Sequence, residues 1–292
     1  MNSRKEDHEP EPASDTLSRD VHAQDTLLLT QCDMDQPRLL AMSGISIAVF
    51  TRRCPGKDTP NEDSAAIIPT GPDSAVLMVA DGVGGVRSGA QASALAVQSL
   101  SKSIRESSLN RDDLRPAILD GIERANAAII ALGIGAATTL ALVEVNGTRI
   151  RPYHVGDSDI LLTGQRGRVK LQTTPHSPVG AAVEAGMIDA EEAFTHENRH
   201  IVSNVVGAED MRMEIGSALK MSRRDTLMLA SDGVSDNLHE GEVIDLIRTG
   251  RLEASAAAMV DAATQRMAGA FELNRPHAKP DDLTFILIRR QA

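Results

Sequence analysis

The amino-acid sequence predicts an α+β protein in which helices cover antiparallel β-sheets. Strand-like apolar runs follow one another in hairpin order, and helical segments come in adjacent pairs between them. This order is typical of layered folds built around antiparallel sheets. With 292 residues, of which 41% are hydrophobic, the chain can form one large domain or two small ones.

The composition limits the classes of partner and the compartment. The net charge of −11 disfavours a nucleic-acid groove or an anionic membrane surface, and 2% aromatic residues leave few platforms for stacking bases. Two cysteines, Cys32 and Cys54, are too few for a disulfide framework or a cysteine zinc site. The N-terminus lacks the apolar core of a signal peptide, and no apolar stretch is long enough to span a bilayer. We therefore expect a cytoplasmic protein without nucleic-acid or membrane partners.

The first 38 residues differ in composition from the rest. They are polar, acidic and proline-containing, apart from three leucines at 27–29. Because such a segment buries little apolar surface, residues 1–38 are predicted to form a disordered acidic tail.

From residue 45 onward, apolar patterns predict strands and then paired helices. Ile45–Phe50 and Ala65–Pro69 are short strand-like runs, and the uninterrupted run Ala75–Ala80 is typical of a strand buried on both faces. Two helices are predicted next, each with an apolar face at three-to-four spacing, over residues 97–104 and 114–129.

The second half of the chain begins with crowded strand signals. Thr138–Val145 and Arg149–Val155 flank Asn146-Gly147, a dipeptide typical of two-residue hairpin turns. The stretch Pro175–Glu209 has no regular period. The remaining predicted elements are strands at Ile160–Thr163, Val169–Gln172, Thr226–Ala230 and Leu283–Ile288 and helices at Glu240–Ile247 and Ala254–Gly269.

Acidic residues stand at the ends of these strands in five places. Asp81-Gly82, Asp157-Ser158 and Asp232-Gly233 follow strands, and Asn61-Glu62-Asp63 and Asp281-Asp282 precede them. Converging carboxylates repel one another unless a cation neutralises them, and their oxygens suit hard ions such as Mg²⁺ or Mn²⁺. A glycine after the aspartate lets the backbone turn closely and offer its carbonyl to the ion. The joint pattern predicts a divalent-metal site, although each Asp-Gly by itself is also typical of a plain turn.

Two other ligand-binding motifs are excluded by spacing. In the segment ADGVGGVRSGAQAS, Gly82 and Gly84 begin a G-x-G-x-x-G fingerprint, but Arg87 occupies the third glycine position. Gly84 and Gly89 have the spacing of a P-loop, but no lysine follows them.

Several motifs together form a recognisable series. In order, the chain carries NED (61–63), ADGVGG (80–85), ATTLALV (137–143), HVGDS (154–158), LASDGVSDN (229–237) and DDLT (281–284). The series resembles the metal-dependent protein phosphatases of type 2C, in their bacterial style, and residues 185–207 look like the flap segment of that family. The likeness runs from about residue 44 to the C-terminus, so residues 44–292 are expected to form a type 2C phosphatase domain.

The resemblance implies a four-layer α-β-β-α sandwich with two central antiparallel sheets and two Mg²⁺ or Mn²⁺ ions at one end. Asp63, with Glu62 beside it, is expected to act in catalysis by binding metal-coordinated waters or a metal. Asp236 is expected to support the metal ligands, and Asp157 to serve turn and strand packing. By motif, the metal ligands are Asp81, which bridges both ions, Gly82 through its carbonyl, Asp232 and Asp281.

The resemblance also implies the reaction. The family hydrolyses phosphoserine and phosphothreonine in proteins without a covalent enzyme intermediate, and water bridging two ions about 3.5–4 Å apart is the nucleophile. In agreement, the chain has no G-x-S-x-G motif, and Cys54, which is followed by PGKDTP, does not begin a C-x₅-R loop. The implied partner is a phosphorylated protein, and the implied role is to oppose a serine/threonine kinase. The alternative is a catalytically inactive, phosphatase-like binding or scaffold module, which the retained aspartates disfavour.

The sequence departs from the family pattern in four places. Val83 stands where some relatives have a histidine general acid, which leaves His154 and His176 as candidates. The segment ALGIGAATTL lacks the acid of a third metal site, and Asp282 and Asp159 replace a usual Asn and Arg. The arginine that normally precedes NED and binds phosphate is displaced, so the candidates for substrate binding are Arg52, Arg53 and Lys57.

Overall fold

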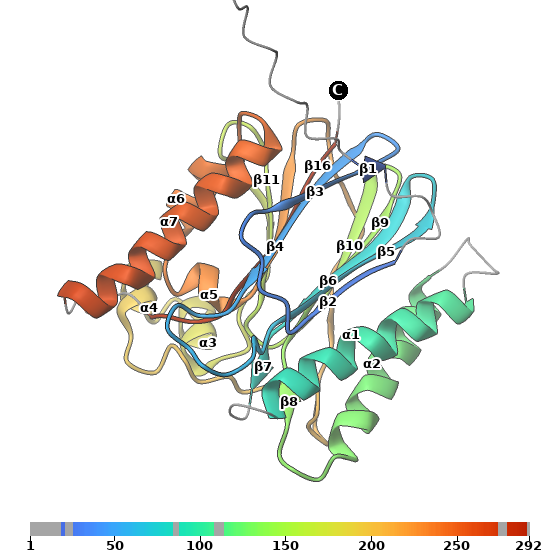
Figure 1. Ribbon diagram of the computed structural model, residues 1–292, viewed down its shortest axis with the longest axis horizontal. Coiled ribbons are helices and arrows are strands. Elements are labelled where there is room, and N and C mark those ends of the chain that lie inside the picture. Colours follow the sequence, from blue (N-terminus) through green and yellow to red (C-terminus); the bar gives the residue numbers. More distant parts are fainter. Residues whose placement is uncertain (1–18, 21–25, 84–87, 108–113, 274–278, 291–292) are drawn as a thin grey trace, which may run out of the picture.

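Two β-sheets pack face to face, and helices cover the outer face of each (Figure 1). The computed structural model describes residues 19–20, 26–83, 88–107, 114–273 and 279–290. Helices α1 and α2 lie outside one sheet, and α6 and α7 lie outside the other (Figure 1). The predicted α+β class and the α-β-β-α layering are therefore confirmed.

The first sheet places the last strand of the chain at its centre. The strand order is β1-β3-β4-β16-β15-β11-β12, and the neighbours are antiparallel except β1 and β3. The start of β16 pairs with the ends of β4 and β15, so one end of the sheet gathers residues from three distant parts of the chain. The strands are β1 (Arg19–Asp20), β3 (Arg38–Met42), β4 (Ile45–Arg52), β11 (Asp159–Thr163), β12 (Val169–Gln172), β15 (Thr226–Ala230) and β16 (Leu283–Arg290).

The second sheet is built from hairpins. Its order is β13-β10-β9-β6-β5-β2, with β14 also paired to β10, and all pairs are antiparallel. The predicted hairpin turn at Asn146-Gly147 is confirmed, and Gly147 takes the left-handed conformation (φ 56°) that favours glycine. The strands are β2 (Leu27–Thr30), β5 (Ser64–Gly71), β6 (Ser74–Ala80), β9 (Leu140–Asn146), β10 (Arg149–Val155), β13 (Glu214–Ile215) and β14 (Leu219–Lys220).

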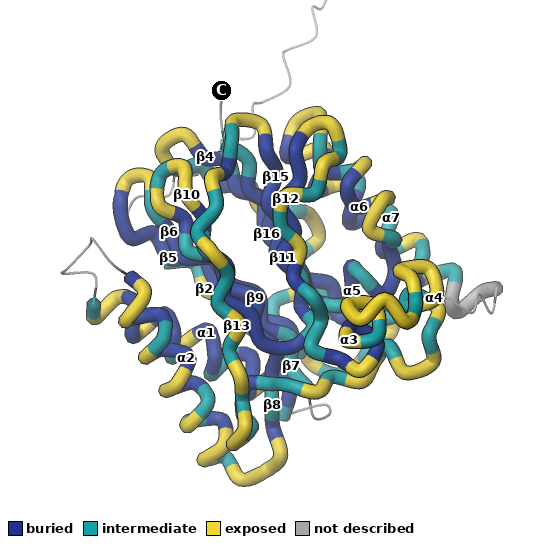
Figure 2. The backbone as a smooth tube through the Cα atoms, turned by 180° about the vertical axis from the view of Figure 1, so that it is seen from behind, coloured by how far each residue is buried: buried dark blue, intermediate teal, exposed yellow. Residues whose placement is uncertain are grey.

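The core consists of three layers of aliphatic side chains. One fills the space between the sheets, one lies under α1 and α2, and one lies under α6 and α7. Every residue of β5 is buried, and so is every residue of β6 after Ser74, as the apolar run predicted (Figure 2). Phe50 and Phe285 stack at 5.7 Å between ring centroids in a core otherwise rich in alanine and branched side chains.

The long helices bury the apolar stripes that predicted them. Residues 97, 100 and 104 of α1 and residues 118, 122 and 129 of α2 are all buried against the second sheet. The helices are α1 (Ser88–Ser107), α2 (Arg115–Ile130), α3 (Pro178–Glu184), α4 (Ala190–Thr195), α5 (Asp232–Ser235), α6 (Glu240–Ile247) and α7 (Leu252–Leu273).

The N-terminal segment differs from its prediction as a disordered tail over residues 1–38. Leu27–Thr30 form strand β2 on the edge of the second sheet, and β3 begins at Arg38, before the expected domain start at residue 44. The physical reason is that Leu29 reaches the core between the sheets while the backbone of β2 pairs with β5. Residues 1–18 and 21–25 of the predicted tail lie outside the described residues.

Short elements also replace predicted irregular structure. Helices α3 and α4 form in the stretch without a period, and residues 82–83 form a small strand, β7 (Gly82–Val83), paired with β8 (Ala137–Thr138). Residues 84–87 of the glycine-rich segment lie outside the described residues.

Candidate metal centre and active site

The predicted metal-site aspartates converge because the strand register aligns the ends of neighbouring strands. Asp63 precedes β5 and Asp81 follows β6, and the first residue of β5 pairs with the last residue of β6. Asp232 follows β15 and Asp281 precedes β16, which are neighbours in the other sheet. The Ser231 hydroxyl donates to Asp63 Oδ2 at 2.7 Å and links the two sheets at this end.

Burial and mutual repulsion raise the pKa values of several carboxyl groups in this region, and a bound cation would relieve that repulsion. The pKa of Asp81 lies well above its usual range, first through burial and next through the charge of Asp63. Burial, followed by the charge of Asp232, raises the pKa of Asp157 to about 8. Burial likewise raises the pKa of Asp159 to about 7. Asp157, expected only to pack a turn, therefore belongs electrostatically to the same acidic cluster.

Glycines next to two of the aspartates allow close contacts between backbones. A Cβ atom on Gly82 would lie 2.2 Å from the carbonyl oxygen of Gly89, at the start of α1. A Cβ atom on Gly233 would lie 2.0 Å from the carbonyl oxygen of Asp282. Since no side chain fits at either position, these glycines are required by the close contact of β7 with α1 and of α5 with the segment before β16, and not only by a local turn.

A lysine lies at the centre of three carboxylates. Lys279 Nζ is 2.8 Å from Asp232 Oδ2, 2.6 Å from Asp236 Oδ2 and 3.0 Å from Asp281 Oδ2. Oxygens of the same three aspartates lie within 4.8 Å of one another, a spacing that suits a single cation. The sequence predicts a supporting role for Asp236 and gives no role to Lys279, whose only local signal is its place two residues before Asp281.

A second lysine holds the other side of the cluster. Lys57 Nζ is 2.7 Å from Glu62 Oε2 and 2.8 Å from Asp282 Oδ2. Asp282 is buried, and its carboxylate also accepts hydrogen bonds from the backbone N–H groups of Cys54 (2.7 Å) and Glu62 (2.6 Å). It therefore fixes the segment before β5 in place.

Two buried oxygens of this region fit a divalent ion. Asp63 Oδ1 and Glu62 Oε1 are buried and have no hydrogen-bond partner among the described residues. An unpartnered buried carboxylate oxygen is costly unless a cation or water contacts it. The donor set of carboxylates and the adjacent Gly82 carbonyl is that of a Mg²⁺ or Mn²⁺ site, so the residues present fit the ions that the sequence predicted.

The three basic candidates for phosphate binding separate in the structure. Arg52 donates to the carbonyl oxygens of Met34 and Asp35, both at 2.8 Å, and Arg53 pairs with Asp33 at 3.3 Å. These contacts attach both arginines to the segment between β2 and β3. Of the three, Lys57 is brought against the acidic cluster.

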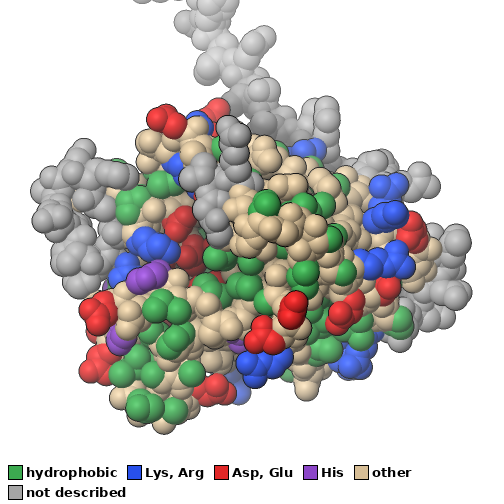
Figure 3. Space-filling view, turned by 90° about the horizontal axis from the view of Figure 1, so that it is seen from below, with side chains coloured by type: hydrophobic (Ala, Val, Ile, Leu, Met, Phe, Trp, Pro, Cys, Tyr) green, Lys and Arg blue, Asp and Glu red, His purple; other side chains and the backbone are tan. Residues whose placement is uncertain are grey.

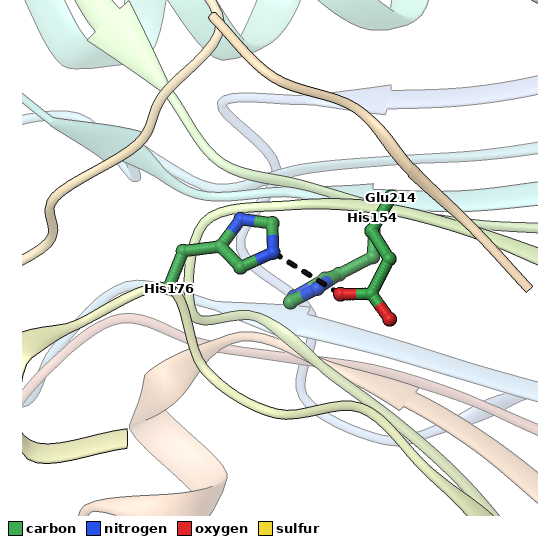
Figure 4. A group of neighbouring side chains, drawn as sticks. All are labelled: His154, His176 and Glu214. Atoms are coloured by element: carbon green, nitrogen blue, oxygen red, sulfur yellow. Dashed lines mark hydrogen bonds and ion pairs between the residues drawn. The ribbon is translucent and has the colours of Figure 1, made fainter. Parts of the chain in front are cut away.

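The two histidines considered as general acids lie together with Glu214 (Figure 4). The rings of His154 and His176 are tilted, with centroids 4.6 Å apart, and His176 Nε2 is 3.3 Å from Glu214 Oε2. Nδ1 of His176 accepts from the Gly156 N–H (3.1 Å) and from the Asn204 amide (2.8 Å). In the neutral ring the proton must then be on Nε2, where it is donated to Glu214. This hydrogen-bond pattern does not leave Nε2 free to bind a metal.

His154 is buried at 1% exposure, and both of its ring nitrogens lack a hydrogen-bond partner among the described residues. Desolvation, helped by His176, lowers its pKa to about 3 from an ordinary value of 6.5. The unfolded chain therefore binds a proton below pH 6.5 that the folded protein does not bind until about pH 3, so stability falls as the pH falls through this window.

Replacing this histidine should remove part of the acid sensitivity. From a folded pKa of about 3, His154 alone costs about 2 kcal/mol of unfolding free energy at pH 5 relative to neutral pH. We expect His154→Leu, of similar volume, to reduce the difference between the unfolding free energies at pH 5 and pH 8 by that amount. Urea unfolding of both proteins at the two pH values measures it, and an unchanged difference would show that His154 is accessible to protons.

A cavity of about 680 Å³ lies between helices α3, α4 and α6 and the acidic cluster. Its apolar lining includes Val179 of α3, Phe194 of α4 and Val243 of α6, and its wall includes Asp232 and Asp236. Figure 3 shows this end of the molecule, where acidic side chains lie in a hollow with lysine and arginine side chains beside it. The cavity therefore lies next to the carboxylates of the cluster.

The flap contacts the acidic cluster at one point and the start of α6 at another. Arg199 Nε lies 3.3 Å from Asp236 Oδ1, and the rings of Phe194 and His239 stack at 3.8 Å. The segment 185–207, identified from the sequence, therefore lies beside the acidic cluster and not elsewhere on the surface.

Comparison with known proteins assigns the chain to a family of enzymes. A family model described as "Protein phosphatase 2C" matches residues 52–271. The serine/threonine phosphatase stp of Listeria welshimeri is 28% identical over 200 residues, which cover 65% of this chain and 79% of the relative.

Solved structures agree with the fold. The serine/threonine phosphatase of S. agalactiae superposes with a TM-score of 0.73 at 25% identity, covering 85% of this chain and all of that one (100%). The catalytic domain of the phosphatase PstP, solved with 2 manganese ions, superposes with a TM-score of 0.68 at 23% identity, covering 85% of this chain and 99% of that one.

Proposed function

Because the chain belongs to the protein phosphatase 2C family, we propose that its acidic cluster is the metal centre of a serine/threonine protein phosphatase. The chain is a metal-dependent enzyme that hydrolyses phosphoserine and phosphothreonine in proteins. The observation that supports the cluster as its centre is the meeting of strand-end carboxylates from both sheets, with raised pKa values and two unpartnered buried oxygens.

We assign the metal-binding residues from this cluster. Asp81 and the Gly82 carbonyl at the end of β6 would hold one ion, and the group of Asp232, Asp236 and Asp281 would hold another. Two divalent ions bound there supply an activated water as nucleophile and neutralise the phosphoryl oxygens.

The remaining acids of the segment before β5 complete the site. Asp63 is held by Ser231 through one oxygen, and its other oxygen is free to accept a hydrogen bond from the nucleophilic water or to bind an ion. Glu62 has the same arrangement, with one oxygen on Lys57 and one free. Both residues would thus orient groups without covalent chemistry of their own.

Lys57 is the basic residue that we propose for the substrate phosphate. Its ammonium already lies among the carboxylates, and it can contact a phosphoryl oxygen as a point charge. Arg52 and Arg53 are held by the segment between β2 and β3 and are not assigned to the phosphate. The neighbouring cavity of about 680 Å³ would accept side chains next to the phosphorylated residue.

The metal requirement is the direct test of this function. In EDTA, the rate of phosphothreonine-peptide hydrolysis should fall below about 1% of the rate with metal present, because divalent ions supply both the nucleophile and the charge neutralisation. Excess Mn²⁺ or Mg²⁺ should restore it. Turnover that persists in EDTA would contradict the metal mechanism, and folded protein without turnover under any metal would favour the inactive scaffold alternative.

We further propose that the enzyme acts in the cytoplasm and opposes a serine/threonine kinase. Within the described residues, none of the helices combines the length and apolar character needed to cross a membrane. Cys32 and Cys54 are both free thiols, which suits a reducing compartment. The net charge of −11 gives no support to a nucleic-acid partner.

A further inference from the structure

We propose that Lys279 is an internal cation that competes with a divalent ion for the carboxylates of Asp232, Asp236 and Asp281. The lysine would thereby set a low affinity at one of the two metal positions. This inference rests on the proposed function of the cluster, and it concerns how readily that position is filled.

The backbone of Lys279 is clamped so that its side chain enters the cluster. The Asn237 amide accepts a hydrogen bond from the Lys279 N–H (3.2 Å) and donates one to the Lys279 carbonyl (2.8 Å). Asn237 itself is fully buried (0% exposure) and also donates to the Gly233 carbonyl at 3.0 Å. The lysine is therefore anchored to the turn of α5 that carries two of the three aspartates.

The ammonium makes one hydrogen bond, to Asp232 Oδ2, and two further ion pairs, to Asp236 and Asp281, inside the cluster. It has three N–H donors, and three carboxylate oxygens lie 2.6–3.0 Å from Nζ. The 2.8 Å contact to Asp232 Oδ2 is a charge-assisted hydrogen bond, and the other two contacts are close ion pairs. One positive charge meets three negative charges, so the group still carries excess negative charge that attracts a divalent ion.

The ammonium and an ion cannot share these oxygens. A Mg²⁺ or Mn²⁺ ion needs the same carboxylate oxygens at about 2.0–2.2 Å, inside the space that Nζ occupies. Binding must then displace the ammonium and lose its contacts, which weakens the observed affinity. The side chain of Lys279 is 31% exposed, so a route to solvent is open to it.

Lys57 provides a matched comparison within the same site. It carries the same charge and also touches two acids, Glu62 and Asp282, at 2.7 and 2.8 Å. It contacts none of the three aspartates around Lys279. Removing Lys57 changes the local charge equally but does not empty the space between those aspartates.

The test is metal binding in the absence of substrate. Full-length protein is freed of metal with EDTA, desalted and titrated with MnCl₂ by calorimetry, as wild type, Lys279→Met and Lys57→Met. We expect Lys279→Met to bind the weaker Mn²⁺ about tenfold more tightly with unchanged stoichiometry, and Lys57→Met to change affinity less than about threefold. The metal-free melting temperature of Lys279→Met should be lower than that of wild type, and its rise with Mn²⁺ should be larger.

The Mn²⁺ affinities of the variants decide whether Lys279 competes with the ion. Equal Mn²⁺ affinity in wild type and Lys279→Met, or equal gains in the two methionine variants, overturns the inference and leaves the proposed function intact. If Lys279→Met does not fold, Lys279→Gln replaces it, and Lys279→Arg should stay within about threefold of wild type because it keeps the cation. A wild-type protein that binds no Mn²⁺ would instead refute the metal centre itself, and the inference with it.

Discussion

Asp81→Asn should lower the turnover of a phosphothreonine peptide by at least about 1,000-fold under saturating Mn²⁺, because metal ions supply several kcal/mol of transition-state stabilisation. Asparagine keeps the shape and one oxygen of the side chain but removes its charge. Asp81 lies at the end of β6, with the carboxylates of Asp63, Asp232 and Asp281 around it. A divalent ion bound in this group would therefore lie next to the Asp81 carboxylate.

The same substitution should not unfold the protein. Burial and neighbouring acids raise the pKa of Asp81 above its value in the unfolded chain. The folded metal-free protein therefore loses stability as the pH rises from the unfolded pKa of Asp81 through its folded pKa. Asparagine does not ionise, so the variant does not lose stability in this way. We therefore expect the variant, melted in EDTA at neutral pH, to be at least as stable as wild type.

Asp261→Asn is the control for charge alone. Asp261 is exposed on α7, and its replacement changes the net charge by the same amount. It should leave turnover and metal dependence unchanged. Turnover of Asp81→Asn within about tenfold of wild type would mean that Asp81 does not hold a catalytic ion.

Gly233→Ala should damage both stability and activity. Its Cβ atom would lie 2.0 Å from the Asp282 carbonyl oxygen and 3.3 Å from Leu283 Cα, so the backbone of α5 or of β16 must move. Overpacking of this kind costs about 3 kcal/mol. Because Asp232 and Asp281 lie on the two segments forced apart, we also expect turnover to fall about 100-fold.

Gly241→Ala separates this clash from a general effect of alanine. Gly241 lies in α6, and a Cβ atom added there would meet no other atom within 4 Å. Alanine should therefore be neutral or stabilise the protein by up to about 1 kcal/mol. Urea unfolding and peptide hydrolysis of both variants give the comparison. Equal unfolding free energies in the two variants would show that the contact between α5 and β16 yields without cost.

Much of the fold could be predicted because local pattern and local structure agree. Arg149–Val155, Val169–Gln172, Thr226–Ala230 and Glu240–Ile247 have the predicted bounds, since each shows a run or period that only one kind of element satisfies. Helix α4 was missed because its six residues bury no apolar stripe, although Asp189 and Glu192 form a capping box that marks its start.

The order of the acids was likewise visible in the sequence, and the strand register brings Asp63, Asp81, Asp232 and Asp281 to one end of the sandwich. The position of an acid at the end of a strand can be read from the chain itself, so this part of the candidate site follows from the sequence.

The positions of the two lysines that pair with these acids could not be predicted from the sequence. Lys279 meets Asp232 across 47 residues and Lys57 meets Asp282 across 225, and these pairings depend on how distant segments pack. Local propensity determines the strands and turns, and it can be read from the sequence. Only the packing of the two sheets determines which basic side chains neutralise the cluster. The same packing brings Leu29 into the core between the sheets.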